Sequence, residues 1–144
     1  MKKALPILWG SILFPIGFIV NAFMMAGSVP VAVYLALSMA TLLLWFWGGT
    51  VCYGLTDNLW MALILGNLVP LIDLMLVLLQ EIVLGGYWQN LFGFATQLFY
   101  LPMLSLSFSL TSMFSRLAPA YIVAFLLMLL AFFLGAFMAK KRRN

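Results

Sequence analysis

The chain has 144 residues, of which 67% are hydrophobic and only 7% are charged, and its mean hydropathy is +1.20. An ordinary soluble domain carries about 25% charged residues, so this composition excludes a soluble globular protein. A transmembrane β-barrel would show short alternating segments between turns, whereas the apolar runs here are long and continuous. The sequence therefore predicts an all-α membrane protein in which residues 1–144 form one integral membrane domain.

The residue types that support common enzyme chemistry are missing from the sequence. There is no histidine and Cys52 is the only cysteine, which excludes an intramolecular disulfide, a CxxC redox pair and a zinc or haem site built from His or Cys. Without a histidine base or a GxSxG motif, a serine hydrolase is not expected either. We therefore predict a non-enzymatic protein with no catalytic residues, no metal site and no cofactor.

The net charge of +4 comes mainly from the chain ends. Lys2 and Lys3 precede an apolar stretch, and four basic residues follow the last one: Lys140, Lys141, Arg142 and Arg143. Basic residues next to apolar segments favour anionic lipid headgroups and a cytoplasmic position. We expect the cell membrane as the location, with the C-terminus cytoplasmic and with lipid rather than nucleic acid as the partner.

Five apolar stretches are long enough to cross a bilayer, which takes about 20 residues per helix. They cover residues 5–26, 31–53, 59–84, 91–114 and 120–139. The breaks between them (AGSVP, GLTDN, GGYWQN and SRLAP) contain Gly, Pro, Asn or Asp, which are typical of turns. Since short connections make neighbouring helices antiparallel, we expect a compact up-and-down bundle of five transmembrane helices. The first stretch is too long for a signal-peptide core, and we interpret it as a retained helix.

The orientation leaves one alternative open. Five spans with a cytoplasmic C-terminus place the N-terminus outside, which the two lysines there oppose. With four spans both ends are inside, and segment 91–114, which contains Pro102 and many Ser and Thr residues, is then re-entrant. Because hydroxyl side chains are readily accommodated between packed helices, we expect five spans.

The most informative pattern lies in segment 59–84. At about 100° per residue, one face of this helix holds Gly66, Asn67, Pro70, Asp73, Gln80 and Glu81. The opposite face holds Leu71, Ile72, Met75, Leu76, Leu78 and Leu79. We therefore expect this helix to be central in the bundle, or to line a cavity with its polar face.

Asp73 is the most unusual residue on that face, because no Lys, Arg or His lies within any predicted span. Desolvation without a cationic partner disfavours a charged carboxylate, so we expect Asp73 to be protonated at neutral pH or to face water. The expected partners are Asn21, Gln97 and the hydroxyls of segment 91–114. Glu81 lies about 12 Å farther along the helix axis at 1.5 Å per residue, where we expect it to contact lipid headgroups or the 85–90 turn.

Pro70 lies three residues before Asp73 and removes one backbone donor, so we expect a kink that leaves a carbonyl free. A kink, a free carbonyl and a carboxyl suit a proton or cation site. They suit a packing notch equally well, and we favour that structural interpretation. Likewise, we expect the Gly48–Gly49 pair to allow close packing of two helices.

Aromatic residues near the predicted segment ends are expected to lie at the membrane interfaces. They are Trp60, Tyr87, Trp88 and Tyr121. Trp45, Phe46 and Trp47 approach the end of the second span.

Two functional hypotheses follow from these features. The first is a small non-enzymatic bundle that acts with a membrane-protein partner, as an accessory, immunity or assembly factor. The alternative is a homo-oligomeric carrier or channel, linked to protons or another cation, that uses Asp73 in the third helix.

Overall fold

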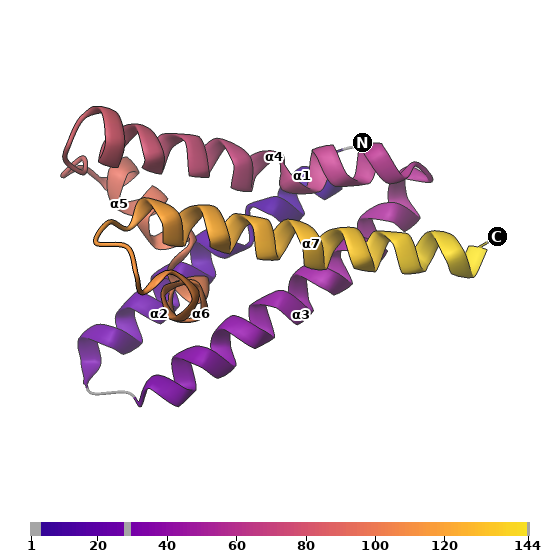
Figure 1. Ribbon diagram of the computed structural model, residues 1–144. Coiled ribbons are helices and arrows are strands. Elements are labelled where there is room, and N and C mark those ends of the chain that lie inside the picture. The colour runs from indigo at the N-terminus through magenta and orange to yellow at the C-terminus, as the bar shows by residue number, and fades with distance from the viewer. Residues whose placement is uncertain (1–3, 28–29, 144) are drawn as a thin grey trace.

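The computed structural model describes residues 4–27 and 30–143, and this part of the chain contains helices and no strand (Figure 1). The elements in chain order are α1 (Ala4–Gly10), α2 (Leu13–Ala26), α3 (Val31–Thr56), α4 (Leu59–Leu78), the π-helix η1 (Leu79–Val83), α5 (Leu91–Phe99), α6 (Leu101–Thr111) and α7 (Ala118–Arg143). The prediction of an all-helical protein is confirmed.

Four helical stretches are long and apolar enough to cross a membrane: Ala4–Ala26, Val31–Thr56, Leu59–Val83 and Ala118–Arg143. They correspond to four of the five predicted segments. The remaining segment, predicted at 91–114, is the pair α5–α6, which bends by 57° at a break of one residue. The basic residues after position 139, predicted to follow the last helix, are instead its final turn, where positive charge is favourable at a helix C-terminus.

Polar residues end and start the helices at the predicted breaks. Asp57 closes α3 in a left-handed conformation (φ 54°), and the Asn58 side chain then accepts a hydrogen bond from the Met61 N–H at the start of α4. Asn90 accepts in the same way from the Gly93 N–H at the start of α5. These are ordinary N-cap interactions that satisfy backbone donors at helix ends.

The N-terminal helices use glycine to approach carbonyls that lie one turn before prolines. Pro70 has no N–H to donate to the Gly66 carbonyl, and a Cβ added at Gly10 in α1 would lie 3.0 Å from that oxygen. Pro102 lies at the start of α6, and a side chain at Gly17 in α2 would collide with the Leu98 carbonyl before it. Glycine at these two positions lets the backbones pack directly.

A second pair of glycines brings α3 and α7 together. A side chain at Gly49 would collide with the backbone of Phe132, and one at Gly135 would collide with the backbone of Phe46. The prediction that the Gly48–Gly49 pair allows close helix packing is confirmed: Gly48 is also in contact with the indole of Trp9.

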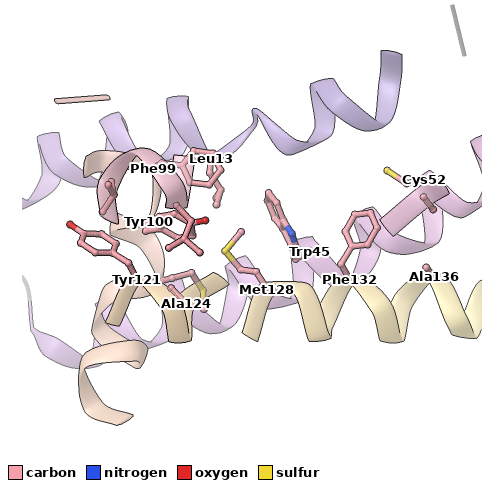
Figure 2. Close-up of a cluster of buried hydrophobic side chains, with 14 of the residues drawn as sticks. Leu13, Trp45, Cys52, Phe99, Tyr100, Tyr121, Ala124, Met128, Phe132 and Ala136 are labelled. Atoms are coloured by element: carbon pink, nitrogen blue, oxygen red, sulfur yellow. The ribbon is translucent and has the colours of Figure 1, made fainter. Parts of the chain in front are cut away.

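The core follows the inner face of α7 (Figure 2). Its buried side chains include Leu13, Trp45, Phe99, Tyr100, Tyr121, Met128 and Phe132. Trp45 and Tyr121 are buried within the protein, with 0% and 3% of their surface exposed, so protein and not lipid surrounds their rings. Both polar groups are accommodated inside, as amphipathic aromatic side chains can be when they find a partner. Trp60, in contrast, is largely exposed.

Polar contacts join α4 and α7 at both ends. Asp57, just before α4, forms an ion pair with Arg143 at the end of α7. At the other end, the Leu117 N–H donates to Glu81 Oε1 over 2.8 Å. The two helices are therefore antiparallel, and the chain leaves η1 and returns to α7 at the same end of the molecule.

The pair α5–α6 connects η1 to α7 and packs against α2, α3, α4 and α7. Figure 1 shows α6 almost end-on while α4 and α7 run across the view, so α6 lies across those helices and not along them. The described chain ends at Ala4 and Arg143 lie toward the same end of the molecule (Figure 1), whereas five spans would place them at opposite ends.

Candidate intramembrane polar site

Burial along α4 and η1 follows the two faces that the sequence predicts. Of the polar-face residues, Glu81 is half-buried and the rest are buried: Gly66, Asn67, Pro70, Asp73 and Gln80. On the apolar face, Leu71, Ile72, Met75 and Leu79 are exposed, and Leu76 and Leu78 are half-buried. The polar face packs against α1, α3, α5 and α7, so this helix is central.

Asn67 connects α4 to α3. Its Oδ1 accepts a hydrogen bond from Trp45 Nε1 over 3.2 Å, and its Nδ2 donates to the Leu63 carbonyl over 3.0 Å. Both polar groups of the Asn67 amide are therefore paired within the protein, as buried amides require.

Gln80 connects η1 to the 85–90 turn and to α5. Its Nε2 donates to Thr96 Oγ1 over 3.0 Å, and its Oε1 accepts from the Trp88 N–H over 2.9 Å. The Thr96 hydroxyl in turn donates a hydrogen bond to the Gly93 carbonyl over 2.8 Å. Gln80 is completely buried, and the π-helical turn that carries it is the kind of local insertion that re-aims side chains within a helix.

Glu81 fastens the same end of the molecule. Besides the Leu117 N–H, it accepts a hydrogen bond at Oε2 from the Tyr87 hydroxyl over 3.0 Å. The expected contact between Glu81 and the 85–90 turn is therefore present. Burial raises the pKa of the Tyr87 phenol, and the neighbouring Tyr121 and Glu81 raise it further, so Tyr87 remains a hydrogen-bond donor at neutral pH.

Tyr100 occupies the break between α5 and α6 and reaches back to α4. It is completely buried, and its hydroxyl donates to the Pro70 carbonyl over 2.6 Å. A hydroxyl from another helix thus binds the backbone at the proline, within one turn of Asp73. On the other side of the break, Ser38 of α3 donates to the Pro102 carbonyl over 2.8 Å.

Asp73 differs from all of these residues. It is 2% exposed, and neither carboxyl oxygen has a hydrogen-bond partner among the residues that the structure describes. Neither expected amide partner bonds to it. Gln97 donates to the Gly93 carbonyl of its own helix, and Asn21 is half-buried on α2. The structure therefore does not bring Asn21 or Gln97 into a bond with Asp73.

The structure assembles a polar site that is only in part the predicted one. Tyr100 bonds to Pro70, Trp45 to Asn67 and Thr96 to Gln80. These three pairings were not predicted from the sequence. Tyr100 lies two residues before Pro102, so a helix break beside a hydroxyl was the available signal. Over residues 4–27 and 30–143, no group of three or more His, Cys, Asp or Glu residues is arranged to hold a metal ion.

No protein-family model, curated protein sequence or solved structure matches this chain.

The hydrogen bonds predict different effects on stability for Gln80 and Asp73. Gln80→Met keeps the side-chain length but removes the bond to Thr96 and leaves the Trp88 N–H without its acceptor, so we expect the free energy of unfolding to fall by about 1–3 kcal/mol. Asp73→Asn removes no hydrogen bond to a described residue, and we expect a change below about 1 kcal/mol. Chemical unfolding in detergent micelles, followed by circular dichroism, measures both. A larger loss for Asp73→Asn than for Gln80→Met would contradict the assignment.

Proposed function

We propose that this chain is a non-enzymatic integral membrane protein that conducts protons across the bilayer as a carrier or channel, with Asp73 as the group that binds the proton. The observation that carries this proposal is the deep burial of the Asp73 carboxyl without a hydrogen-bond partner among residues 4–27 and 30–143. An ionisable residue inside a membrane segment is costly, and such residues mark ion or proton pathways.

The division of labour along α4 supports a functional role for Asp73 over the packing role favoured from sequence. Asn67, Gln80 and Glu81 make the bonds that join α4 to α3, α5 and the start of α7. Gly10 fills the notch beside Pro70. Since the helices are fastened without Asp73, a locking role leaves its carboxyl unexplained, and an unsatisfied buried group calls for an explanation.

The surroundings favour a proton over a metal cation. Hard cations such as Ca²⁺ and Mg²⁺ take about six to eight oxygen ligands. The Asp73 carboxyl stands alone, and the nearby Pro70 carbonyl already accepts from Tyr100. A proton needs only the carboxyl itself.

We further propose a topology of four spans with α5–α6 as a re-entrant pair. The support comes from the contacts that place residues 81 and 117 together at one end, and residues 57 and 143 together at the other. With this arrangement both termini are cytoplasmic, so that Lys2 and Lys3 and the basic end of α7 obey the positive-inside rule together. Broken helices that enter the membrane partway are typical of transport sites near the midplane, and Tyr100 lies at this break.

A chain of this size encloses little water by itself, so we propose that it works as a homo-oligomer in the cell membrane. The basic residues 140–143, exposed at the end of α7, then lie where anionic headgroups are available.

Proton flux into vesicles tests the proposal directly. The purified protein is placed in lipid vesicles with a pH-sensitive dye inside, a pH gradient is imposed, and the potential is clamped with potassium and valinomycin. We expect the wild type to collapse the gradient and Asp73→Asn to fall to the level of protein-free vesicles. Asp57→Asn makes the same chemical change at an exposed turn and should conduct like the wild type.

Equal flux from the wild type and Asp73→Asn would reject the proposal. It would favour the other hypothesis, a partner-binding accessory factor, which is supported by an apolar groove. Between α4 and α7 runs an open apolar groove of about 620 Å³, lined by residues such as Leu63, Ile64, Leu68, Leu126 and Leu130. The protein extracted from its host would then carry a second protein at fixed stoichiometry.

Cysteine labelling tests the topology. In a Cys52→Ala background, single cysteines are placed at Gln89, Arg116 and Lys140, which are exposed or half-buried outside the apolar part of the helices. In intact cells we expect a membrane-impermeant maleimide to label positions 89 and 116 and to reach position 140 only after permeabilisation. If positions 89 and 116 reacted from opposite sides, α5–α6 would be a complete span.

A further inference from the structure

The Pro70 carbonyl lies one turn before Asp73 on the buried face of α4 and binds a hydroxyl from outside that helix. It already accepts from the Tyr100 hydroxyl over 2.6 Å. Asp73 follows it by three residues on the same buried face. Carbonyls in these helices also accept from threonine hydroxyls: Thr50 donates to the Trp47 carbonyl over 2.7 Å, and Thr96 to the Gly93 carbonyl over 2.8 Å.

The two charge states of Asp73 require different partners. A protonated carboxyl has one O–H to donate, and an ionised carboxylate only accepts. In the first state Asp73 does not need a donor, and the Tyr100 hydroxyl can stay on the Pro70 carbonyl. In the second state the available donor is the Tyr100 hydroxyl, which is already held at that carbonyl.

We propose that the Tyr100 hydroxyl exchanges between the Pro70 carbonyl and the Asp73 carboxyl as Asp73 gains and loses its proton. This inference rests on the proposed function and adds a positioning residue to it. When Asp73 is protonated, Tyr100 donates to Pro70, as in the structure. When the proton leaves, Tyr100 donates to the carboxylate and keeps its own proton, so the ionised state gains one hydrogen bond inside the membrane.

The location of Tyr100 connects this exchange to the fold. The residue is the junction at which α5 and α6 bend by 57°, and its ring packs edge-on against Phe99 and Tyr121. The proposed exchange would therefore make one hydrogen bond of this junction depend on the charge of Asp73.

Few other titratable groups face Asp73. Tyr121 on α7 is the phenol whose ring packs against that of Tyr100, with the ring centroids 6.0 Å apart. Residues 4–10 of α1 and the residues of α5 carry no titratable side chain. On α3, Cys52 and Tyr53 lie at the Asp57 end of the helix, and on α4 and η1 the other acid is Glu81, bonded to Tyr87 and Leu117. Tyr121 is therefore the natural control.

Infrared difference spectra across pH test the exchange in the full-length protein in lipid vesicles. The protein carries ¹³C-ring-labelled tyrosine, and Asp73→Asn identifies the carboxyl band of Asp73. We expect a tyrosine band to shift with the same midpoint as the carboxyl band, and to be absent in Asp73→Asn. Tyr100→Phe should abolish the tyrosine shift while the carboxyl band still titrates, and Tyr121→Phe should leave both in place.

The outcomes separate the two proposals. A carboxyl band that titrates without any tyrosine shift, or a tyrosine shift that vanishes in Tyr121→Phe and persists in Tyr100→Phe, overturns the exchange and leaves the proposed function standing. Identical spectra for the wild type and Asp73→Asn overturn both. If Tyr100→Phe does not fold, the comparison of labelled wild type with Asp73→Asn decides, because a silent tyrosine spectrum there already refutes the exchange.

Discussion

Inside a lipid bilayer there is no water to pair with a free backbone group, so each N–H and C=O must find its partner within the protein. A proline inside a helix leaves one carbonyl without its helical donor. Pro70 does so for the Gly66 carbonyl, against which Gly10 brings the backbone of α1. Pro102 lies at the start of α6, and the Leu98 carbonyl before it, against which Gly17 packs, takes the Tyr100 N–H. The carbonyls of the two prolines accept from the hydroxyls of Tyr100 and Ser38.

Against this background the Asp73 carboxyl is the exception. Every other member of the α4 polar face with a polar side chain is bonded within the protein, at Asn67, Gln80 and Glu81. Natural sequences break such rules mainly at functional sites. The exception also lies beside the helix break at Tyr100, where a hydroxyl is held within reach of the same turn of α4. A buried acid, a hydroxyl on the neighbouring carbonyl and a bent helix pair lie together here, and the proposed proton binding depends on that arrangement.

The sequence predicts the parts of this arrangement that depend on local pattern. The two faces of segment 59–84 followed from helical periodicity, and the turns at 57–58 and 90 followed from Asn and Asp, which serve as caps. It did not predict which hydroxyl meets Pro70, nor that Trp45 and Tyr121 are buried, because those contacts depend on how helices far apart in the chain cross. The choice between a span and a re-entrant pair at 91–114 also depends on long-range contacts, above all that of Glu81 with residue 117. Composition alone is compatible with a complete span and with a re-entrant pair.

The most direct test of the central claim is the reaction of the protein in its membrane with dicyclohexylcarbodiimide, an apolar reagent that modifies protonated carboxyl groups. Peptide mass spectrometry then locates the adduct. We expect an adduct at Asp73 that forms less as the pH rises. Asp57 and Glu81 should stay largely unmodified, because they are exposed or bonded at the ends of the helices. No adduct at Asp73 at any pH, or one that forms equally at every pH, would contradict a carboxyl that binds and releases a proton inside the membrane.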